Sequence, residues 1–262
     1  MLHYSASGAK PAREERRLLA EAPLAIELRG GPAYTIMRTP PHEGAPATDR
    51  ELAVGFLLAE GLIRSADDIH VLEECAGGAN CIRATLAGEP PPEVGRTLAV
   101  SASCGLCGRT DVETLVANLA PVAGRFEAPV DVLYALPERV HAGQALFAAT
   151  GASHAAALFR ADGEILILRE DIGRHNALDK VVGHALLAGM DLSAAGVFLS
   201  GRVSLEMVVK TVRAGVPLIA AVSAASAAAV EAAERLGLTL CGFARGSEVT
   251  VYTHDERVKG AG

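Results

Sequence analysis

Residues 197–243 decide the fold, and they read VFLSGRVSLEMVVKTVRAGVPLIAAVSAASAAAVEAAERLGLTLCGF. Apolar segments of strand length alternate there with segments of helical spacing. The strand-like segments are residues 197–199, 216–222 and 239–243, and the helical ones are residues 205–212 and 225–236. Short links from strand to helix to strand are typical of crossovers between parallel strands. We therefore predict an α/β fold in which helices cover a central sheet.

The same alternation extends upstream of this core. Residues 155–159 and 165–168 flank Asp162-Gly163, which predicts a hairpin with a tight turn. A helix is expected over residues 176–187. Another is expected from Pro137 to about residue 149, because proline favours the first turn of a helix.

The N-terminal part of the chain has a different order of predicted strands and helices. A hairpin is expected from residues 24–28 and 34–37, followed by a helix over residues 50–60 and two short strands. We expect four parts in all. They are a polar arm over 1–22, a smaller α+β part over 23–135, an α/β part over 136–255 and a polar tail over 256–262.

Composition limits the functional classes. Half of the residues are hydrophobic and 21% are charged, which excludes a wholly disordered chain. The net charge of −7 argues against a general nucleic-acid binder. No apolar run reaches the roughly 18 residues that a membrane span needs, and the polar N-terminus does not resemble a secretory signal. We expect a cytoplasmic protein without membrane partners.

The chain has five cysteines, an odd and sparse set that does not suggest a disulfide framework. In the cytoplasm we expect them to be reduced. Cys241 lies in an apolar strand and is interpreted as core packing. The five are Cys75, Cys81, Cys104, Cys107 and Cys241.

Cys104-Gly105-Leu106-Cys107 is the sharpest local feature. The two thiols lie on a glycine-rich loop just before a capping box at residues 110–113, so they lie near a helix N-terminus. The helix dipole and Arg109 would favour the thiolate. Four interpretations compete: a persulfide carrier, a dithiol redox pair, half of a zinc site, and small buried residues in a loop.

The zinc interpretation is weaker than the persulfide one. Zinc nucleobase deaminases open a helix with P-C-x-x-C and also require an H-x-E segment. No H-x-E occurs upstream of Cys104. Cys75 and Cys81 could complete an all-cysteine set, although their spacing is loose for zinc. We therefore expect no metal.

Polar residues follow several predicted strands at the same edge of the sheet. Each serine alone is explained by helix capping, and His154 by default as a core histidine. Their common edge, with arginines close by, instead predicts a pocket for a phosphate-bearing ligand. The residues are Ser200, Gly201 and Arg202, then Ser223 and Ser226, then Arg245, Gly246 and Ser247, with the charged segment 169–180 alongside. No dinucleotide-binding or P-loop motif is present.

Several of these segments together resemble one known family, the formate dehydrogenase accessory proteins of the FdhD/NarQ sulfurtransferase family. The resemblance covers residues from about 24 to about 253. The segments that carry it are ELAVGFLLAEG at 51–61, SCGLCG at 103–108, TGASHAA at 150–156, REDIGRHNALDK at 169–180, SGRVS at 200–204 and GFARG at 242–246.

The resemblance implies a cytoplasmic sulfur carrier required for formate dehydrogenase activity. Such a protein takes sulfur from a cysteine desulfurase as a cysteine persulfide. It passes the sulfur to the molybdenum cofactor, as bis-molybdopterin guanine dinucleotide, before the cofactor enters formate dehydrogenase. The implied fold is a cytidine-deaminase-like mixed sheet without the zinc ligands. The alternative is a non-catalytic chaperone or scaffold that binds cofactor and dehydrogenase.

The implied roles fall on specific residues. Cys104 matches the family's persulfide cysteine, and Cys107 matches the second cysteine of its motif. The segment assigned to the cofactor matches Phe243, Ala244, Arg245, Gly246, Ser247 and Glu248. By position, the candidates to neutralise the cofactor's phosphates are Arg174, Arg202, Lys210 and Arg245. We expect a homodimer, because symmetric dimers are the commonest oligomers.

Overall fold

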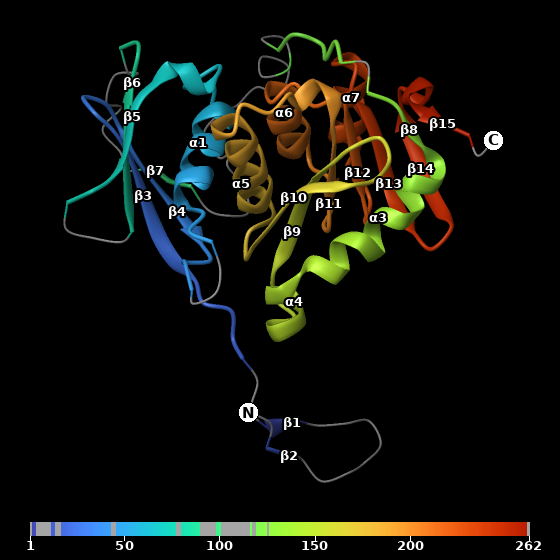
Figure 1. The fold of residues 1–262 in the computed structure, drawn as a ribbon, viewed down its shortest axis with the longest axis horizontal. Helices are drawn as coiled ribbons and strands as arrows, with labels where there is room; N and C mark the ends of the chain where they lie inside the picture. Colours follow the sequence, from blue (N-terminus) through green and yellow to red (C-terminus); the bar gives the residue numbers. More distant parts are fainter. Residues whose placement is uncertain are drawn as a thin grey trace.

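A six-stranded mixed sheet forms the centre of the C-terminal part (Figure 1). The computed structural model describes residues 2–3, 12–13, 17–42, 46–76, 80–89, 98–100, 116, 119–124 and 126–260. The strand order is β10-β9-β11-β12-β13-β14, and β11, β12 and β13 run parallel. The bounds are β9 His154–Phe159, β10 Ile165–Asp171, β11 Gly196–Leu199, β12 Leu218–Ala221, β13 Thr239–Arg245 and β14 Glu248–Thr253. The predicted α/β class, with parallel strands joined through helices, is confirmed.

Helices cover both faces of this sheet. Consecutive residues of β9, such as Ala156 and Ala157, belong to different hydrophobic clusters, one on each face of the sheet. Buried residues of α5, α6 and α7 join the first cluster, and those of α3 join the second. The helix bounds are α3 Val130–Gly143, α4 Ala145–Thr150, α5 Arg174–Leu187, α6 Leu205–Arg213 and α7 Ala227–Arg235.

The helix predicted to begin at Pro137 begins seven residues earlier, at Val130, and Pro137 lies inside it. Proline in a helix interior removes one backbone hydrogen bond. Burial of Leu133, Leu136 and Val140 against the sheet offsets that loss, because these residues share one face of the helix. The spacing of these three residues was the signal that the proline obscured.

A five-stranded sheet in the N-terminal part has the order β5-β6-β3-β4-β7. Its bounds are β3 Ala22–Leu28, β4 Ala33–Arg38, β5 Ile69–Glu74, β6 Cys81–Leu86 and β7 Leu98–Val100. Helix α1, Asp49–Ala59, packs against this sheet and against α5, so α1 and α5 lie between the two sheets (Figure 1). One hydrophobic cluster contains buried residues of both sheets and both helices.

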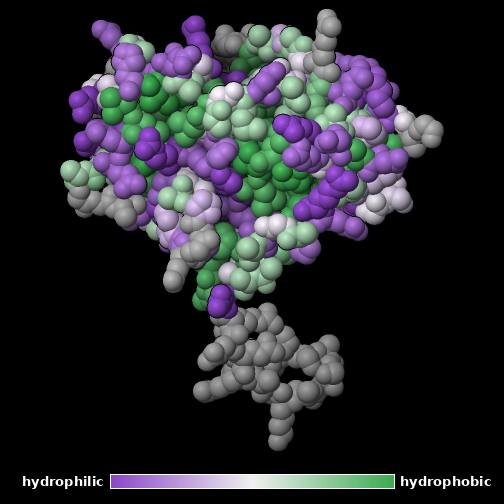
Figure 2. Space-filling view, viewed as in Figure 1, coloured by the Kyte–Doolittle hydropathy of each residue, from purple (hydrophilic) through white to green (hydrophobic). Residues whose placement is uncertain are grey.

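Short elements complete the structure. They are β1 Leu2–His3 paired with β2 Ala12–Arg13, β8 Ala128–Pro129 paired with β15 Val258–Lys259, and the 3-10 helices η1 Ala66–Asp68, η2 Leu192–Ala194 and η3 Asp255–Arg257. In the described part of the chain, every helix is too short or too polar to traverse a lipid bilayer. Figure 2 shows apolar surface in the middle of one face, over β9 and β10, bordered by hydrophilic residues.

The crossing of α1 and α5 requires glycine on both helices. A Cβ atom on Gly55 would lie 1.9 Å from the carbonyl oxygen of Asp179, and one on Gly183 would lie 1.9 Å from the carbonyl oxygen of Glu51. The two helices therefore pack backbone against backbone. This close approach brings the two sheets into one core.

Gly183→Ala should therefore destabilise the protein. The added methyl group meets backbone that cannot rotate away, so we expect a loss of about 1–3 kcal/mol or more in the free energy of unfolding, measured by urea denaturation. Gly143→Ala is the matched control, because its Cβ would meet only the side chain of Leu168, at 3.5 Å. Equal losses for the two variants would contradict the crossing as described.

Candidate functional site

Cys104 and Cys107 lie outside the described residues, as does most of the helix expected after them. Their assignment stays a prediction from the sequence. The other site residues predicted from the sequence lie in the described part of the chain, and most of them meet at one edge of the six-stranded sheet.

That edge is where β11, β12 and β13 end. Ser200 follows β11, and its hydroxyl accepts a hydrogen bond from the backbone N–H of Ala155, 2.8 Å away. Ser223 follows β12, and its carbonyl accepts one from the N–H of Phe243 on β13, at 3.2 Å. These bonds connect the end of β11 to β9 and the end of β12 to β13. Ser226 instead caps helix α7, with its hydroxyl oxygen 3.2 Å from the N–H of Ala229.

Three basic side chains gather at this edge, and we call His154, Arg174 and Arg202 the cationic cluster. Arg174 is the first residue of α5, and Arg202 lies in the loop between β11 and α6. Between them, a Cβ on Gly201 would lie 3.4 Å from His154 Nδ1 and 3.6 Å from Arg174 Cδ. The absence of a side chain at Gly201 therefore leaves room for the side chains of His154 and Arg174 to lie close to the Gly201 backbone.

The cluster has an excess of positive charge. Burial lowers the pKa of His154, the charges of Arg174 and Arg202 lower it further, and Asp171 opposes them. Arg174 Nε is buried without a hydrogen-bond partner among the described residues. The N-terminus of α5 adds its own partial positive charge. An anion bound here would satisfy the buried N–H group and offset the charges.

A cavity of about 580 Å³ adjoins the cluster. His154, Ser200 and Val222 line it on the sheet side, and His141 and Phe147 line it from α3 and α4. Ser153 also lines it, but its hydroxyl donates to the carboxylate of Glu170 at 2.7 Å. The volume suits a small-molecule ligand with apolar and polar parts.

Segment 243–248 spans the end of β13 and the turn into β14, at the edge where β11 and β12 also end. Phe243 has a φ of +52°, in the left-handed region, and its side chain is 36% exposed. The guanidinium carbon of Arg245 lies 5.5 Å from the centre of the Phe243 ring. An aromatic residue in that conformation is uncommon and is a recognised feature of binding sites.

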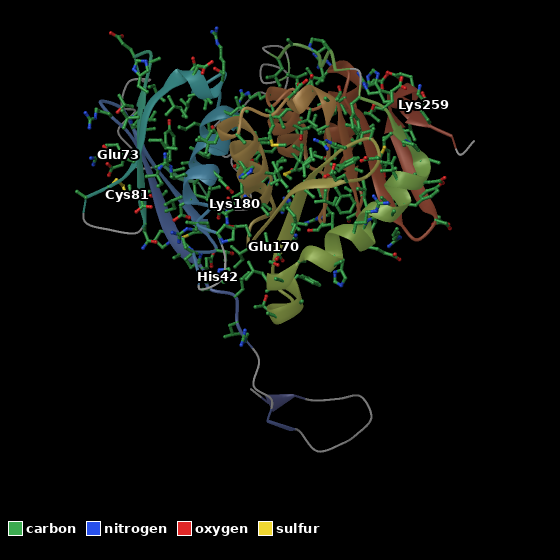
Figure 3. The ribbon with its side chains drawn as sticks, in the orientation of Figure 1. His42, Glu73, Cys81, Glu170, Lys180 and Lys259 are labelled. Atoms are coloured by element: carbon green, nitrogen blue, oxygen red, sulfur yellow. A yellow bond between two sulfur atoms is a disulfide. The ribbon has the colours of Figure 1, made fainter. Side chains whose placement is uncertain are left out.

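The charged segment 169–180 is largely buried. Charged residues such as Asp179 and Lys180 in a helix would by themselves suggest a solvated helix face, but each is 2% exposed. Lys180 Nζ lies 2.6 Å from Asp171 Oδ2, and Figure 3 shows Lys180 between the two parts of the molecule. These residues hold the structure together and leave Arg174 at the edge.

Asp171 connects the two parts directly. Its carboxylate, which is 0% exposed, accepts hydrogen bonds from Lys180 Nζ, Asn176 Nδ2, Gly173 N and Thr39 N, at 2.6–3.1 Å. Thr39 follows β4 of the five-stranded sheet, and its hydroxyl accepts a bond from the N–H of Ile172 at 2.9 Å. The loop that presents Arg174 is therefore fixed to the N-terminal part.

Lys210 does not face the edge, contrary to its place among the phosphate-neutralising candidates. It is 5% exposed, and its Nζ lies 2.7 and 2.9 Å from the two carboxylate oxygens of Asp179. Burial raises the pKa of Asp179 to about 6, against the charge of Lys210. Burial works to lower the pKa of Lys210, but the charge of Asp179 prevails and raises it. The pair joins α5 to α6.

Cys75 and Cys81 form a disulfide, which corrects the expectation of reduced thiols. Cys75 follows β5 and Cys81 begins β6, and the antiparallel pairing brings their Cα atoms to 5.4 Å. Two cysteines flanking the turn of a hairpin were the signal in the sequence. In this form they cannot complete a zinc site with Cys104 and Cys107. Cys241 is buried as predicted, and burial raises the pKa of its thiol to about 12.

The Lys210–Asp179 pair generates a prediction about stability. Lys210→Met leaves a buried carboxylate without its partner, which should cost about 3–5 kcal/mol of unfolding free energy. Lys210→Met with Asp179→Leu removes both charges and should recover most of the loss in chemical denaturation. A single variant that keeps full stability but loses anion binding would instead return Lys210 to the ligand site.

Comparisons with known proteins show the family of the chain. The family model described as the FdhD/NarQ family matches residues 19–259. The chain is 42% identical to the sulfur carrier protein FdhD of Mycolicibacterium paratuberculosis, over 96% of this chain and 95% of the relative. It is 41% identical to that of Streptomyces avermitilis, over 92% and 88%. The fold is similar to a solved structure from Desulfotalea psychrophila designated a formate dehydrogenase accessory protein. That likeness has a TM-score of 0.76 at 24% identity and covers 99% and 97% of the two chains. The chain therefore belongs to the FdhD/NarQ family.

Proposed function

We propose that this protein is a sulfurtransferase of the cytoplasm that carries sulfur to the molybdenum cofactor for formate dehydrogenase. Its sulfur donor is a cysteine desulfurase, and its acceptor substrate is bis-molybdopterin guanine dinucleotide. The names of the relatives, sulfur carrier protein FdhD, support the carrier role. The observation that carries the substrate assignment is the cationic cluster, where Arg174 has a buried Nε without a hydrogen-bond partner among the described residues and lies beside half-buried His154 and exposed Arg202.

The cluster suits the pyrophosphate groups of such a substrate. Phosphate oxygens accept hydrogen bonds from the N–H groups of Arg174 and Arg202, and an arginine can donate two parallel hydrogen bonds to one phosphate. The whole molecule carries −7, so the local excess of positive charge at this edge is what selects an anionic ligand. Phe243 and Arg245 offer an exposed ring and cation against which a guanine base can stack.

A cytidine-deaminase-like arrangement is part of the proposal. In zinc nucleobase deaminases, H-x-E and P-C-x-x-C segments hold the metal. Here, α5 begins at Arg174-His175-Asn176, and the loop before α6 is Ser200-Gly201-Arg202-Val203. Arg174 at the start of α5 and Arg202 in the loop before α6 support anion binding by this chain.

Sulfur transfer begins at Cys104. Its thiolate attacks the terminal sulfur of the desulfurase persulfide, the donor S–S bond breaks, and the donor cysteine leaves as a thiolate. Cys104 then carries the added sulfur as a persulfide. Cys107 is the second thiol of the loop and can take part in releasing the sulfur to the acceptor. A homodimer, formate dehydrogenase and the desulfurase are the proposed partners.

Sulfur loading should depend on Cys104. Incubation with a cysteine desulfurase and cysteine should add one sulfur atom to the peptide that contains Cys104, detected by mass spectrometry. Cys104→Ala should abolish the gain, and Cys107→Ala should retain it, because only Cys104 matches the persulfide cysteine. A wild-type protein that gains no sulfur would favour the non-catalytic chaperone, which needs no chemistry of its own.

GDP, which resembles half of the substrate's nucleotide portion, should bind at the cationic cluster. At about 100 times its Kd it should add roughly 2.7 kcal/mol of stability, a rise in Tm of about 5–10 °C. Arg174→Ala, Arg202→Ala or Arg245→Ala should each weaken binding on the order of tenfold, since each removes a charge-assisted contact.

Arg160→Ala is the matched control for this experiment. Arg160 follows β9 at the end opposite His154, where it pairs with Glu164 on the surface, so its loss should leave GDP affinity unchanged. Cys104→Ala should also leave the rise in Tm intact. An equal rise with ADP or with inorganic phosphate would refute the guanine-nucleotide assignment.

A further inference from the structure

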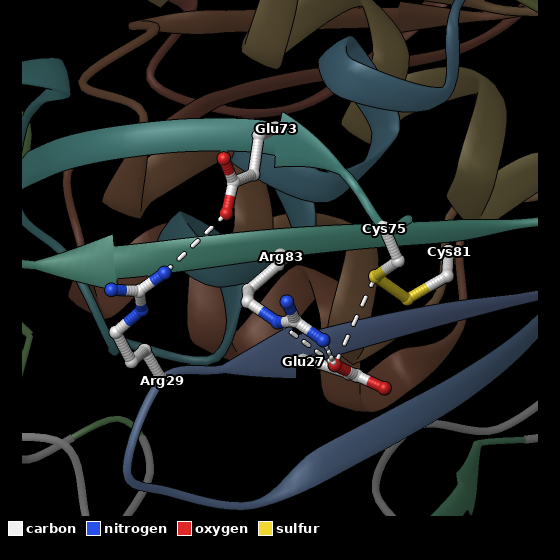
Figure 4. Close-up of a disulfide and its surroundings, with 6 residues drawn as sticks. All are labelled: Glu27, Arg29, Glu73, Cys75, Cys81 and Arg83. Atoms are coloured by element: carbon white, nitrogen blue, oxygen red, sulfur yellow. Dashed lines mark hydrogen bonds and ion pairs between the residues drawn. A yellow bond between two sulfur atoms is a disulfide. The ribbon is translucent and has the colours of Figure 1, made fainter. Parts of the chain in front are cut away.

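The Cys75–Cys81 disulfide lies on the five-stranded sheet, away from the cationic cluster. Figure 3 shows Cys81 on the outer side of the molecule, and Figure 4 shows the pair with Glu27 of β3 and Arg83 of β6 beside it. Both cysteines are half-buried, so neither belongs to the buried core. Disulfides of cytosolic proteins are usually transient and take part in chemistry.

A carboxylate faces this disulfide. Glu27 of β3 places Oε2 3.8 Å from Cys75 Sγ, and a carboxylate oxygen of Glu27 and both sulfur atoms lie within 4.8 Å of one another. Arg83 of β6 holds the carboxylate in place, with Nη2 2.8 Å and Nε 3.1 Å from the same oxygen (Figure 4). Parallel pairing of β3 and β6 puts Glu27 opposite Arg83, so the backbone fixes this arrangement.

Cys75 Sγ lies where a thiol at this position would donate a hydrogen bond to Glu27 Oε2. In the disulfide, this hydrogen bond does not form. A disulfide sulfur has no proton, so the 3.8 Å contact becomes a hydrogen bond only when Cys75 is a thiol. A carboxylate next to a sulfur favours the neutral thiol over the thiolate, because the two negative charges repel each other. The site is thus arranged to accept Cys75 as the released, protonated cysteine.

We propose that this disulfide captures hydrosulfide as a protein persulfide. HS⁻ attacks Cys81 Sγ, the Cys75–Cys81 S–S bond breaks, and its electron pair leaves on Cys75 Sγ. Cys81 then carries the added sulfur, and the proton released when this persulfide ionises passes to Cys75, which donates to Glu27. The two oxidising equivalents of the disulfide move to the captured sulfur, so no further oxidant is needed.

The step is reversible and differs from the proposed loading of Cys104. When Cys75 loses its proton, its thiolate attacks Cys81 Sγ, re-forms the disulfide and expels HS⁻. The pair thus stores and releases sulfur from inorganic sulfide, without a desulfurase. Cys241 cannot compete, because its thiol is buried and, with no second described cysteine free to pair with it, does not form a disulfide.

The test uses the full chain with Cys104→Ala and Cys107→Ala, so that the C-x-x-C loop plays no part. The oxidised protein is treated with sodium sulfide, alkylated with iodoacetamide and digested with trypsin. Residues 65–83 form one tryptic peptide that contains both cysteines. We expect this peptide to gain one sulfur atom, which fragment ions place on Cys81, with Cys75 alkylated as a simple thiol.

Two controls isolate the disulfide. The same protein, reduced beforehand and freed of reductant, should gain no sulfur, since sulfide does not add to a thiol. This control introduces no further substitution that could disturb folding. In the same background, Cys81→Ser should abolish the gain, and Cys241→Ser should retain it.

Four results would overturn the inference: a disulfide untouched by sulfide, two alkylated thiols without added sulfur, the added sulfur on Cys75, or no disulfide after mild oxidation. Desulfurase loading of Cys104 in the wild-type protein tests the proposed function separately.

Discussion

The rest of the structure depends on the buried carboxylate of Asp171. A carboxylate with no exposed surface is stable only when its charge and its lone pairs are all matched, because removing it from water costs several kcal/mol. Lys180 supplies the opposite charge, and Asn176, Gly173 and Thr39 supply N–H groups. These donors come from both parts of the chain, so the carboxylate is satisfied only when β4, β10 and α5 meet. The start of α5, and with it Arg174, is fixed as a consequence.

Other ion pairs reinforce this junction without taking part in the site. Arg38 makes two bonds of 2.8 and 2.9 Å to Asp49, which joins β4 to α1. Arg169 makes two to Glu51, at 2.6 and 2.8 Å, which joins β10 to α1. Burial works to raise the pKa of Glu51, but the bonds from Arg169 and His184 bring it below its ordinary value. Cations and carboxylates are thus matched at the junction. The cationic cluster differs from it because positive charge there exceeds negative charge.

Sequence patterns predicted the helices and strands better than they predicted which side chains contact one another. Alternating strand and helix segments predicted β11, β12, β13 and the helices between them, because buried apolar positions repeat with the period of each element. The same patterns could not show that Lys210 pairs with Asp179, 31 positions away on another helix, since a charged residue looks solvated until its partner is known. His154 was interpreted as a core residue by default. Its neighbours Arg174 and Arg202 come from other elements, and only the fold brings them close.

The distribution of charge bears on both proposed anions, the phosphate-bearing ligand and hydrosulfide. Its net charge of −7 repels anions in general, so an anionic ligand is held only where local charge or chemistry compensates. At the sheet edge, the compensation is the positive charge of the cationic cluster, which suits the delocalised charge of phosphate. At the hairpin of β5 and β6, Glu27 and Arg83 neutralise each other, so positive charge does not attract sulfide there. In the proposed capture, hydrosulfide is instead retained by a covalent S–S bond, whereas phosphate does not attack a disulfide and is not retained. The two proposed sites therefore discriminate between anions by different physical means and need not interfere with each other.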